Sequence, residues 1–278
     1  MAQVSPVPAL VSGLVSLALR AGRVILDIYA TDFAVSQKAD ASQVTQADRD
    51  AEALILDGLA RLHPGVPIVA EEEAAAGRIP HAGERFFLVD PLDGTKEFVS
   101  RNGEFTVNIA LIEHGAPIAG VVYAPALGVL YAGEVGSGAW KGLVRDDHLT
   151  SLTPIQVRDA PARLSAIGSR SHGAAETGDW LQQFPIGSFV AAGSSLKFCL
   201  VAEGAADLYP RLGRTMEWDT AAGDAVLRAA GGVVTTMDGL PLTYGRCIQA
   251  GDAPFANPHF VAYGDRNLVR HSSAQAGG

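Results

Sequence analysis

The sequence predicts an α/β protein with an antiparallel N-terminal half and a C-terminal half of alternating strands and helices. Apolar runs at residues 105–112, 116–123 and 129–135 are joined by short Gly/Pro links, which indicates an antiparallel meander because parallel strands need longer crossovers. Beyond residue 163, strand-like runs alternate with helical segments of about ten residues, a pattern typical of a layered α/β fold. The chain of 278 residues is 48% hydrophobic, enough for an extensive core.

Charge and cysteine content favour a cytoplasmic protein that acts on small molecules. The formal net charge of −9 leaves no surplus of lysine and arginine to replace the counterions of a nucleic-acid polymer. Cys199 and Cys247 form no CxxC pair, so we expect free thiols in a reducing compartment. We see no signal-peptide pattern and no uninterrupted apolar run of the ~18 residues that a membrane span needs.

The first elements are two packing helices. Apolar residues recur every three or four positions over residues 8–30, which predicts an amphipathic helix. Thr45, with Asp48 three residues later, predicts the start of a second helix that Pro64 and Gly65 end. Asp48 therefore has an ordinary interpretation as a capping carboxylate.

Two predicted strands then carry acids at their ends. A strand at 66–70 leads into Glu71 and two further glutamates, followed by a Gly/Ala/Pro-rich loop over 74–83. Three consecutive glutamates are also typical of a solvated loop. The second strand, 86–90, opens the segment FFLVDPLDGT and breaks at a turn that contains Asp90 and Asp93. Two carboxylates held that close repel unless a cation lies between them, although Asp-Pro and Asp-Gly are also common turn dipeptides.

A polar, proline-containing segment at 145–162 is the best candidate for a boundary between domains 1–150 and 151–278. The second domain is predicted to hold strands at 164–168, 186–191, 206–210 and 233–237, and helices at 174–183, 194–203 and 219–230. Residues 272–278 are small and polar, typical of a frayed tail. Asp219 begins the last helix, where an N-cap role would also explain it. Together with Glu71, Asp90 and Asp93 it completes a set of four acids near strand and helix ends, where α/β proteins gather ligands.

Three motifs in this order, AEE, DPLDGT and WDTAAGDAVLRAAGG, resemble those of the lithium-sensitive, magnesium-dependent inositol monophosphatase superfamily. The resemblance covers residues 38–232. Lys96-Glu97-Phe98 after the DGT turn is similar to the CysQ-like 3'(2'),5'-bisphosphate nucleotidases, whereas inositol monophosphatases tend to have Thr-Asn-Phe there. Gln43 departs from the family, which usually has proline at this position, so we expect a looser loop before Asp48 and weaker metal binding.

The resemblance implies a layered αβαβα sandwich and two to three Mg²⁺ ions per active site. Glu71, Asp90 and the carbonyl of Leu92 would hold one ion, and Asp90, Asp93 and Asp219 a second. Glu71 would also orient a third, mostly hydrated ion. These are oxygen ligands, which Mg²⁺ prefers.

The same resemblance implies the catalytic roles. Asp48 and Thr95 would form the hydrogen-bonded pair that takes a proton from the attacking water. The backbone N–H groups of Gly94 and Thr95 would receive the scissile phosphate. Glu71, Leu92, Asp93 and Asp219 would also line the substrate site.

The implied substrate is adenosine 3',5'-bisphosphate, cleaved to AMP, and its sulfated relative, in sulfur assimilation. Ser169, His172, Ser194 and Lys197 would contact the nucleotide, although Lys197 as a solvated helix residue and His172 as a loop residue are open alternatives. The competing functions are a phosphatase for inositol 1-phosphate or another small polyol or sugar phosphate, and a regulator that binds a phosphate ligand without turnover. The resemblance also allows a homodimer and peripheral attachment to the inner face of the cell membrane.

Overall fold

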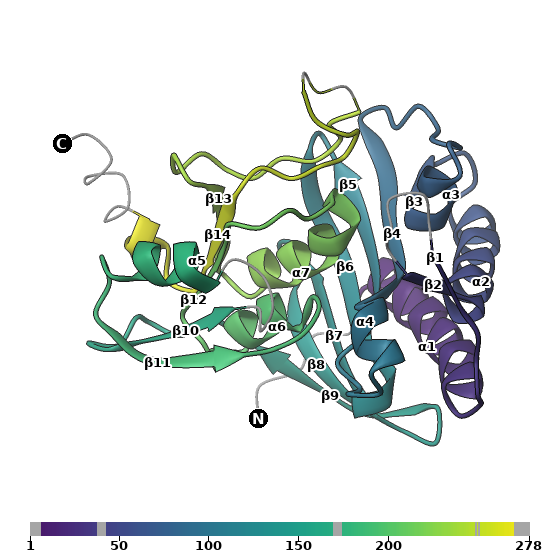
Figure 1. Ribbon diagram of the computed structural model, residues 1–278, viewed down its shortest axis with the longest axis horizontal. Helices are drawn as coiled ribbons and strands as arrows, with labels where there is room; N and C mark the ends of the chain where they lie inside the picture. The colour runs from purple at the N-terminus through teal and green to yellow at the C-terminus, as the bar shows by residue number, and fades with distance from the viewer. Residues whose placement is uncertain (1–6, 38–42, 169–173, 248, 250, 270–278) are drawn as a thin grey trace.

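The computed structural model describes residues 7–37, 43–168, 174–247, 249 and 251–269. It confirms the predicted α/β class and its five layers, which Figure 1 shows side by side. Helices α1 (Ala9–Tyr29) and α2 (Gln46–Leu62) cover one face of a large sheet. Helices α6 (Leu196–Ala202) and α7 (Glu217–Ala229) lie between this sheet and a smaller one, whose outer face carries α5 (Ala174–Leu181).

In the described residues, the large sheet has seven strands in sequence order from β3 to β9. Only β3 and β4 pair in parallel among these, and the remaining pairs are antiparallel, as the short links predict. The strands are β3 (Ile68–Ala70), β4 (Arg85–Asp93), β5 (Thr106–Glu113), β6 (Ala116–Ala124), β7 (Val129–Glu134), β8 (Gly138–Arg145) and β9 (His148–Ile155). Strand β4 is buried on both faces, which explains its unbroken apolar run: Phe87 packs toward α1 and α2, and Phe86 toward α7.

Helix α1 is a core helix. Its mean hydropathy of 1.7 and its length would allow it to cross a membrane, and no other helix of the described residues meets this test. Its apolar residues Leu14, Ala18 and Ile25 are fully buried against α2 and the large sheet. The two arginines of the helix, Arg20 and Arg23, interrupt its apolar run.

Helix α7 packs against both sheets. Its buried residues share one core with large-sheet residues such as Leu88 and small-sheet residues such as Phe260. The backbone of α7 approaches the large sheet at glycines: a Cβ on Gly120 would lie 2.7 Å from the carbonyl oxygen of Ala222. A side chain at this glycine would separate helix and sheet.

The small sheet follows the order β11-β10-β12-β14-β13 and is mixed. Strand β10 pairs in parallel with β11 and β12, and β14 runs antiparallel to β12 and β13. The strands are β10 (Leu164–Gly168), β11 (Ile186–Ala191), β12 (Leu208–Arg211), β13 (Val233–Thr236) and β14 (Phe260–Tyr263). Two short strands, β1 (Val35–Gln37) and β2 (Gln43–Thr45), form a separate antiparallel pair.

Several elements differ from the sequence expectations. The segment at 145–162, predicted as an irregular boundary, contains β9, which pairs with β8 along the edge of the large sheet. Since residues 150 and 151 both lie within β9, we propose that the domains divide after Ile155. Strand β4 continues through Pro91, where the sequence predicted a break. The short helices α3 (Glu71–Ala75) and α4 (Thr95–Val99), and strand β14, were not predicted.

Candidate active site

A bulge in β4 places Asp90 and Asp93 on the same face of the sheet. Asp90 pairs with Asn108 of β5 and Asp93 with Thr106, so three steps along β4 match two along β5. Residues three apart on a regular strand point to opposite faces, but the extra residue turns both carboxylates to one side. Proline is tolerated at such a bulge, which accounts for Pro91.

Glu71 approaches Asp90 from the neighbouring strand. It follows β3 directly and is the first residue of α3. Asp90 is 1% exposed, and its Oδ1 accepts a hydrogen bond from the backbone N–H of Leu92 at 3.0 Å. Burial raises the pKa of Asp90 well above its ordinary value, and the negative charges of Glu71, Asp93 and Asp219 raise it further. A hydrogen bond with Glu71 acts in the same direction.

Asp219 comes from the N-terminal end of α7, in the far half of the sequence. Its Oδ2 accepts the backbone N–H of Met216 at 2.8 Å. Met216 is the N-cap and Asp219 the third residue of the helix, so Asp219 caps the helix from this position and is not the N-cap that the sequence suggested. Burial raises the pKa of Asp219 well above its ordinary value, and the charges of Asp93 and Glu71 add to this effect. Asp219 is thus both a cap and a member of the acidic group.

Asp48 likewise combines a capping role with a contact to the site. Its Oδ2 accepts the backbone N–H and the hydroxyl of Thr45, at 2.8 and 2.6 Å. Its other oxygen, Oδ1, accepts the hydroxyl of Thr95 at 3.4 Å, across 47 residues of sequence. Thr95 is the first residue of α4, which Gly94 precedes in a left-handed conformation with φ of 92°. The structure therefore brings together the two members of the predicted proton-accepting pair.

A buried polar network that sequence reasoning missed holds Asp93. The Oδ2 of Asp93 accepts the hydroxyls of Ser194 and Ser195, at 2.5 and 3.1 Å. The Ser195 hydroxyl also lies 2.5 Å from the backbone carbonyl of Asp219, and it accepts the side-chain amide of Asn108. Thr106 contacts Ser194 through its hydroxyl. The signal was available, because Thr106 and Asn108 are buried polar residues two apart on an otherwise apolar strand.

Of the four residues predicted to contact the nucleotide, the structure describes Ser194 and Lys197. Lys197 is 6% exposed, and its Nζ donates to the carbonyl oxygens of Ser194, at 2.5 Å, and Ala192, at 3.4 Å. Burial lowers its pKa to about 8, although the nearby Asp93 opposes that shift. Ser194 therefore binds Asp93, and Lys197 binds backbone carbonyl oxygens of the loop before α6. Ser169 and His172 lie outside the described residues.

Arg211 is a further candidate that the sequence analysis did not single out. It ends β12, and its positive charge acts on Asp219, Lys197 and Tyr209. Its Nη2 donates to the carbonyl oxygen of Arg214 at 3.0 Å, while its buried Nε has no hydrogen-bond partner among the described residues. An arginine at a strand end beside the acidic group is the signal that could have identified it.

The chemistry of this acidic group fits Mg²⁺. Glu71, Asp90, Asp93 and Asp219 act on one another electrostatically, and carboxylates whose charges repel in a partly buried place are stabilised by a divalent cation. Among the described residues, no group of three or more Asp, Glu, His or Cys side chains lies in an arrangement that could already hold a metal ion. Instead, protein donors hold Asp90, Asp93 and Asp219. The fit to Mg²⁺ therefore rests on the type of ligand atom, a carboxylate oxygen, and on its negative charge.

Comparisons with known proteins agree with this architecture. Residues 9–262 match the model of the inositol monophosphatase family. The chain is 51% identical over 230 residues to the 3'(2'),5'-bisphosphate nucleotidase CysQ of Escherichia coli (strain K12), covering 82% of this chain and 91% of that protein. It is 33% identical to the CysQ nucleotidase of Haemophilus influenzae, with 91% of each chain covered. The crystal structure of CysQ from Bacteroides thetaiotaomicron superposes with a TM-score of 0.76 at 37% identity, over 93% of this chain and 98% of that one. The chain belongs to the inositol monophosphatase family, as its three motifs predicted.

Proposed function

We propose that the chain is a Mg²⁺-dependent 3'(2'),5'-bisphosphate nucleotidase that hydrolyses adenosine 3',5'-bisphosphate to AMP and phosphate. The observation that carries this proposal is the 51% identity to a curated nucleotidase over 82% of the chain. The acidic group and the Asp48–Thr95 contact support it, since they supply the charges and the proton acceptor that cleavage of a phosphate ester requires. The sulfated relative of this nucleotide is a second substrate of the same chemistry, and cytoplasmic sulfur assimilation is the proposed setting.

The proposed ligands of two to three Mg²⁺ ions are Glu71, Asp90, the carbonyl oxygen of Leu92, Asp93 and Asp219. Bound Mg²⁺ would neutralise charge on the phosphate ester and make the attacking water more acidic. The residues around the ligands fix their directions. The Ser195 hydroxyl shares its proton between Oδ2 of Asp93 and the backbone carbonyl oxygen of Asp219, so it links two proposed ligands from distant parts of the sequence.

Asp48 and Thr95 are the proposed proton acceptors. The two hydrogen bonds from Thr45 engage Oδ2 of Asp48, which leaves Oδ1 directed at the Thr95 hydroxyl. In the proposed step, the attacking water gives a proton to Oγ1 of Thr95, and the proton already on Oγ1 passes to Oδ1 of Asp48. The backbone N–H groups of Gly94 and Thr95 are the proposed donors to the scissile phosphate.

The second phosphate of the nucleotide needs a cationic contact. Arg211 is our proposed partner, because its charge lies beside Asp219 and a guanidinium binds phosphate well. Ser194 donates to Asp93, and Lys197 donates to two carbonyl oxygens of the loop before α6, so contacts with the nucleotide would compete with these hydrogen bonds. The contacts of Ser169 and His172 stay predictions. A homodimer and peripheral membrane association also remain proposals, which light scattering and vesicle co-sedimentation test.

Identification of the product tests the proposal. The purified chain is incubated with adenosine 3',5'-bisphosphate and Mg²⁺, and the nucleotides are separated by chromatography, with a parallel reaction in EDTA. We expect 5'-AMP and one equivalent of phosphate, and no turnover in EDTA. Formation of 3'-AMP, or phosphate release that EDTA does not affect, would contradict the proposal. Absence of release from any phosphate ester would favour the binding regulator.

A further inference from the structure

Helix α2 presents two carboxylates to different parts of the proposed site. Asp48 reaches Thr95 at the start of α4. Glu52 lies four residues later, so it is on the same face of the helix one turn along. The function proposed above has no role for Glu52, although it is a 3% exposed carboxylate.

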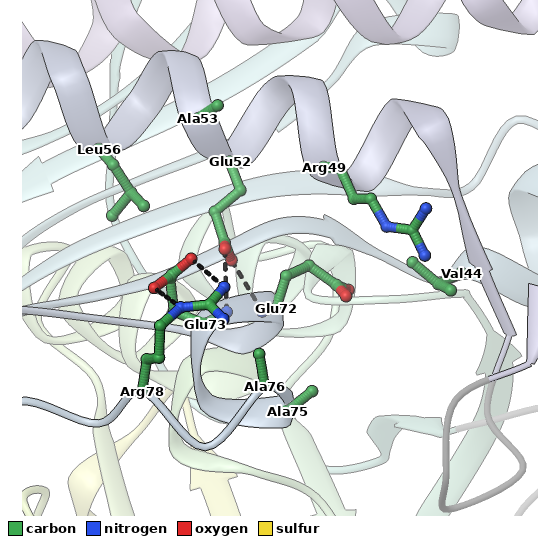
Figure 2. A pocket seen from close by; sticks show the side chains of 10 residues that line it. All are labelled: Val44, Arg49, Glu52, Ala53, Leu56, Glu72, Glu73, Ala75, Ala76 and Arg78. Atoms are coloured by element: carbon green, nitrogen blue, oxygen red, sulfur yellow. Dashed lines mark hydrogen bonds and ion pairs between the residues drawn. The ribbon is translucent and has the colours of Figure 1, made fainter.

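Glu52 binds the first turn of α3. Its Oε2 accepts the backbone N–H of Glu72 at 2.8 Å, and its Oε1 accepts that of Glu73 at 3.0 Å. Figure 2 shows the side chain reaching from α2 to this turn. The N-cap residue of α3, Ala70, offers no side-chain hydrogen bond, so Glu52 supplies the cap that the local sequence lacks. A helix of only five residues needs such an external contact to keep its conformation.

The turn held by Glu52 also carries Glu71. Glu71 is the first residue of α3, directly before the two amides that Glu52 binds, and it hydrogen-bonds to Asp90. We propose that Glu52 is a positioning residue that fixes the direction of Glu71 for Mg²⁺ binding. This inference rests on the proposed function, in which Glu71 is a metal ligand. Helix α2 then positions the proton-accepting pair through Asp48 and a metal ligand through Glu52.

Charged side chains and a pocket surround Glu52 beside its two backbone hydrogen bonds. A pocket of about 470 Å³ lies beside it, with Arg49, Glu72, Glu73 and Arg78 in its lining. The guanidinium of Arg78 pairs with Glu73 at 2.6 Å, which Figure 2 shows next to Glu52. Burial raises the pKa of Glu52 to about 7, and the charges of Glu72 and Glu73 add to the rise while their backbone N–H groups oppose it. The two backbone N–H groups thus stabilise the carboxylate of Glu52 against its loss of solvation.

The test compares Mg²⁺ binding and local structure in Glu52→Gln. The amide keeps the shape of the side chain but replaces one of the two accepting oxygens by an NH2 donor, so it cannot reproduce the present contacts, in which each oxygen accepts one backbone N–H. Glu52→Asp, which keeps the charge but retracts it, is the second variant and serves if Glu52→Gln fails to fold. The matched control is Asp207→Asn, because Asp207 is also buried and accepts a backbone N–H, that of Ser165 at 2.7 Å, away from the acidic group.

Mg²⁺ affinity is measured by calorimetry on the metal-free protein, and protection of the Glu72 and Glu73 amides by hydrogen exchange. We expect Mg²⁺ binding to weaken about tenfold or more in Glu52→Gln, as for other groups that orient a metal ligand, with faster exchange in α3. Asp207→Asn should leave both unchanged even where it lowers the melting temperature. Faster hydrogen exchange together with a Mg²⁺ affinity within twofold of wild type would show that Glu52 is only a structural cap, and it would overturn the proposal. Unchanged exchange of the Glu72 and Glu73 amides would overturn it as well. Neither measurement depends on which phosphate ester the enzyme cleaves, so the result stands apart from the proposed substrate.

Discussion

Replacing Gly120 by alanine tests how α7 positions Asp219. The new Cβ would lie 2.7 Å from the carbonyl oxygen and 2.9 Å from the Cα of Ala222, and 2.9 Å from the Cβ of Ala225. Two of these atoms belong to the backbone, so the contact cannot be relieved by a rotamer change, and α7 must move from β6 by several tenths of an ångström. Overpacking of this kind costs about 1–3 kcal/mol of unfolding free energy. Since Asp219 lies one turn before Ala222, the shift also changes its spacing from Asp93.

Urea unfolding and steady-state turnover measure the two effects. We expect Gly120→Ala to lose about 1–3 kcal/mol of unfolding free energy and to lower turnover at a fixed Mg²⁺ concentration. The matched control is Gly178→Ala in α5, where a Cβ would meet no atom of the described residues within 4 Å, so the helix should gain about 1 kcal/mol with unchanged turnover. Wild-type stability and turnover in Gly120→Ala would refute the close approach of α7 to the sheet.

Two further predictions concern carboxylates. Asp93→Asn removes one charge from the acidic group, so we expect kcat to fall on the order of 100-fold with the circular dichroism spectrum unchanged, and wild-type turnover would contradict its role as a metal ligand. For Glu52, the folded pKa of about 7 lies above its ordinary value of 4.5, so between these pH values the folded protein keeps a proton that the unfolded chain releases. The unfolding free energy of wild type relative to Glu52→Gln should therefore fall by up to about 3 kcal/mol as pH rises from 4.5 to 7, and then stay constant. Urea titrations across this range measure it, and a difference that does not vary with pH would show that Glu52 is not a buried carboxylate.

The sequence predicted the elements whose patterns are set by burial. Helix α1 and strands β5 to β7 follow their apolar periodicity because one or both faces contact the core. Strand β9 was missed for the opposite reason: it is an edge strand, and all eight of its residues are exposed or half-buried, so its sequence looks like a loop. Pro154 is compatible with that edge, although it suggested a break.

The acidic residues of the site could be predicted from motifs, but their supporting contacts could not. Glu71, Asp90, Asp93 and Asp219 stand at recognisable places in short sequence signatures. Ser195 contacts Asp93 across 102 residues, and Glu52 contacts Glu72 across 20. Such pairs depend on how helices and sheets pack, which local sequence patterns do not record. Likewise, the bulge that turns Asp90 and Asp93 to one face is a matter of strand register.

A competition assay tests the central claim most directly. Adenosine 3',5'-bisphosphate and inositol 1-phosphate are supplied together at equal concentration with Mg²⁺, and the consumption of each is followed by phosphorus NMR. At equal concentration the ratio of the two rates gives the ratio of the kcat/KM values. We predict that the bisphosphate nucleotide is consumed faster. Faster consumption of inositol 1-phosphate would contradict the account and identify the chain as a phosphatase of small polyol phosphates.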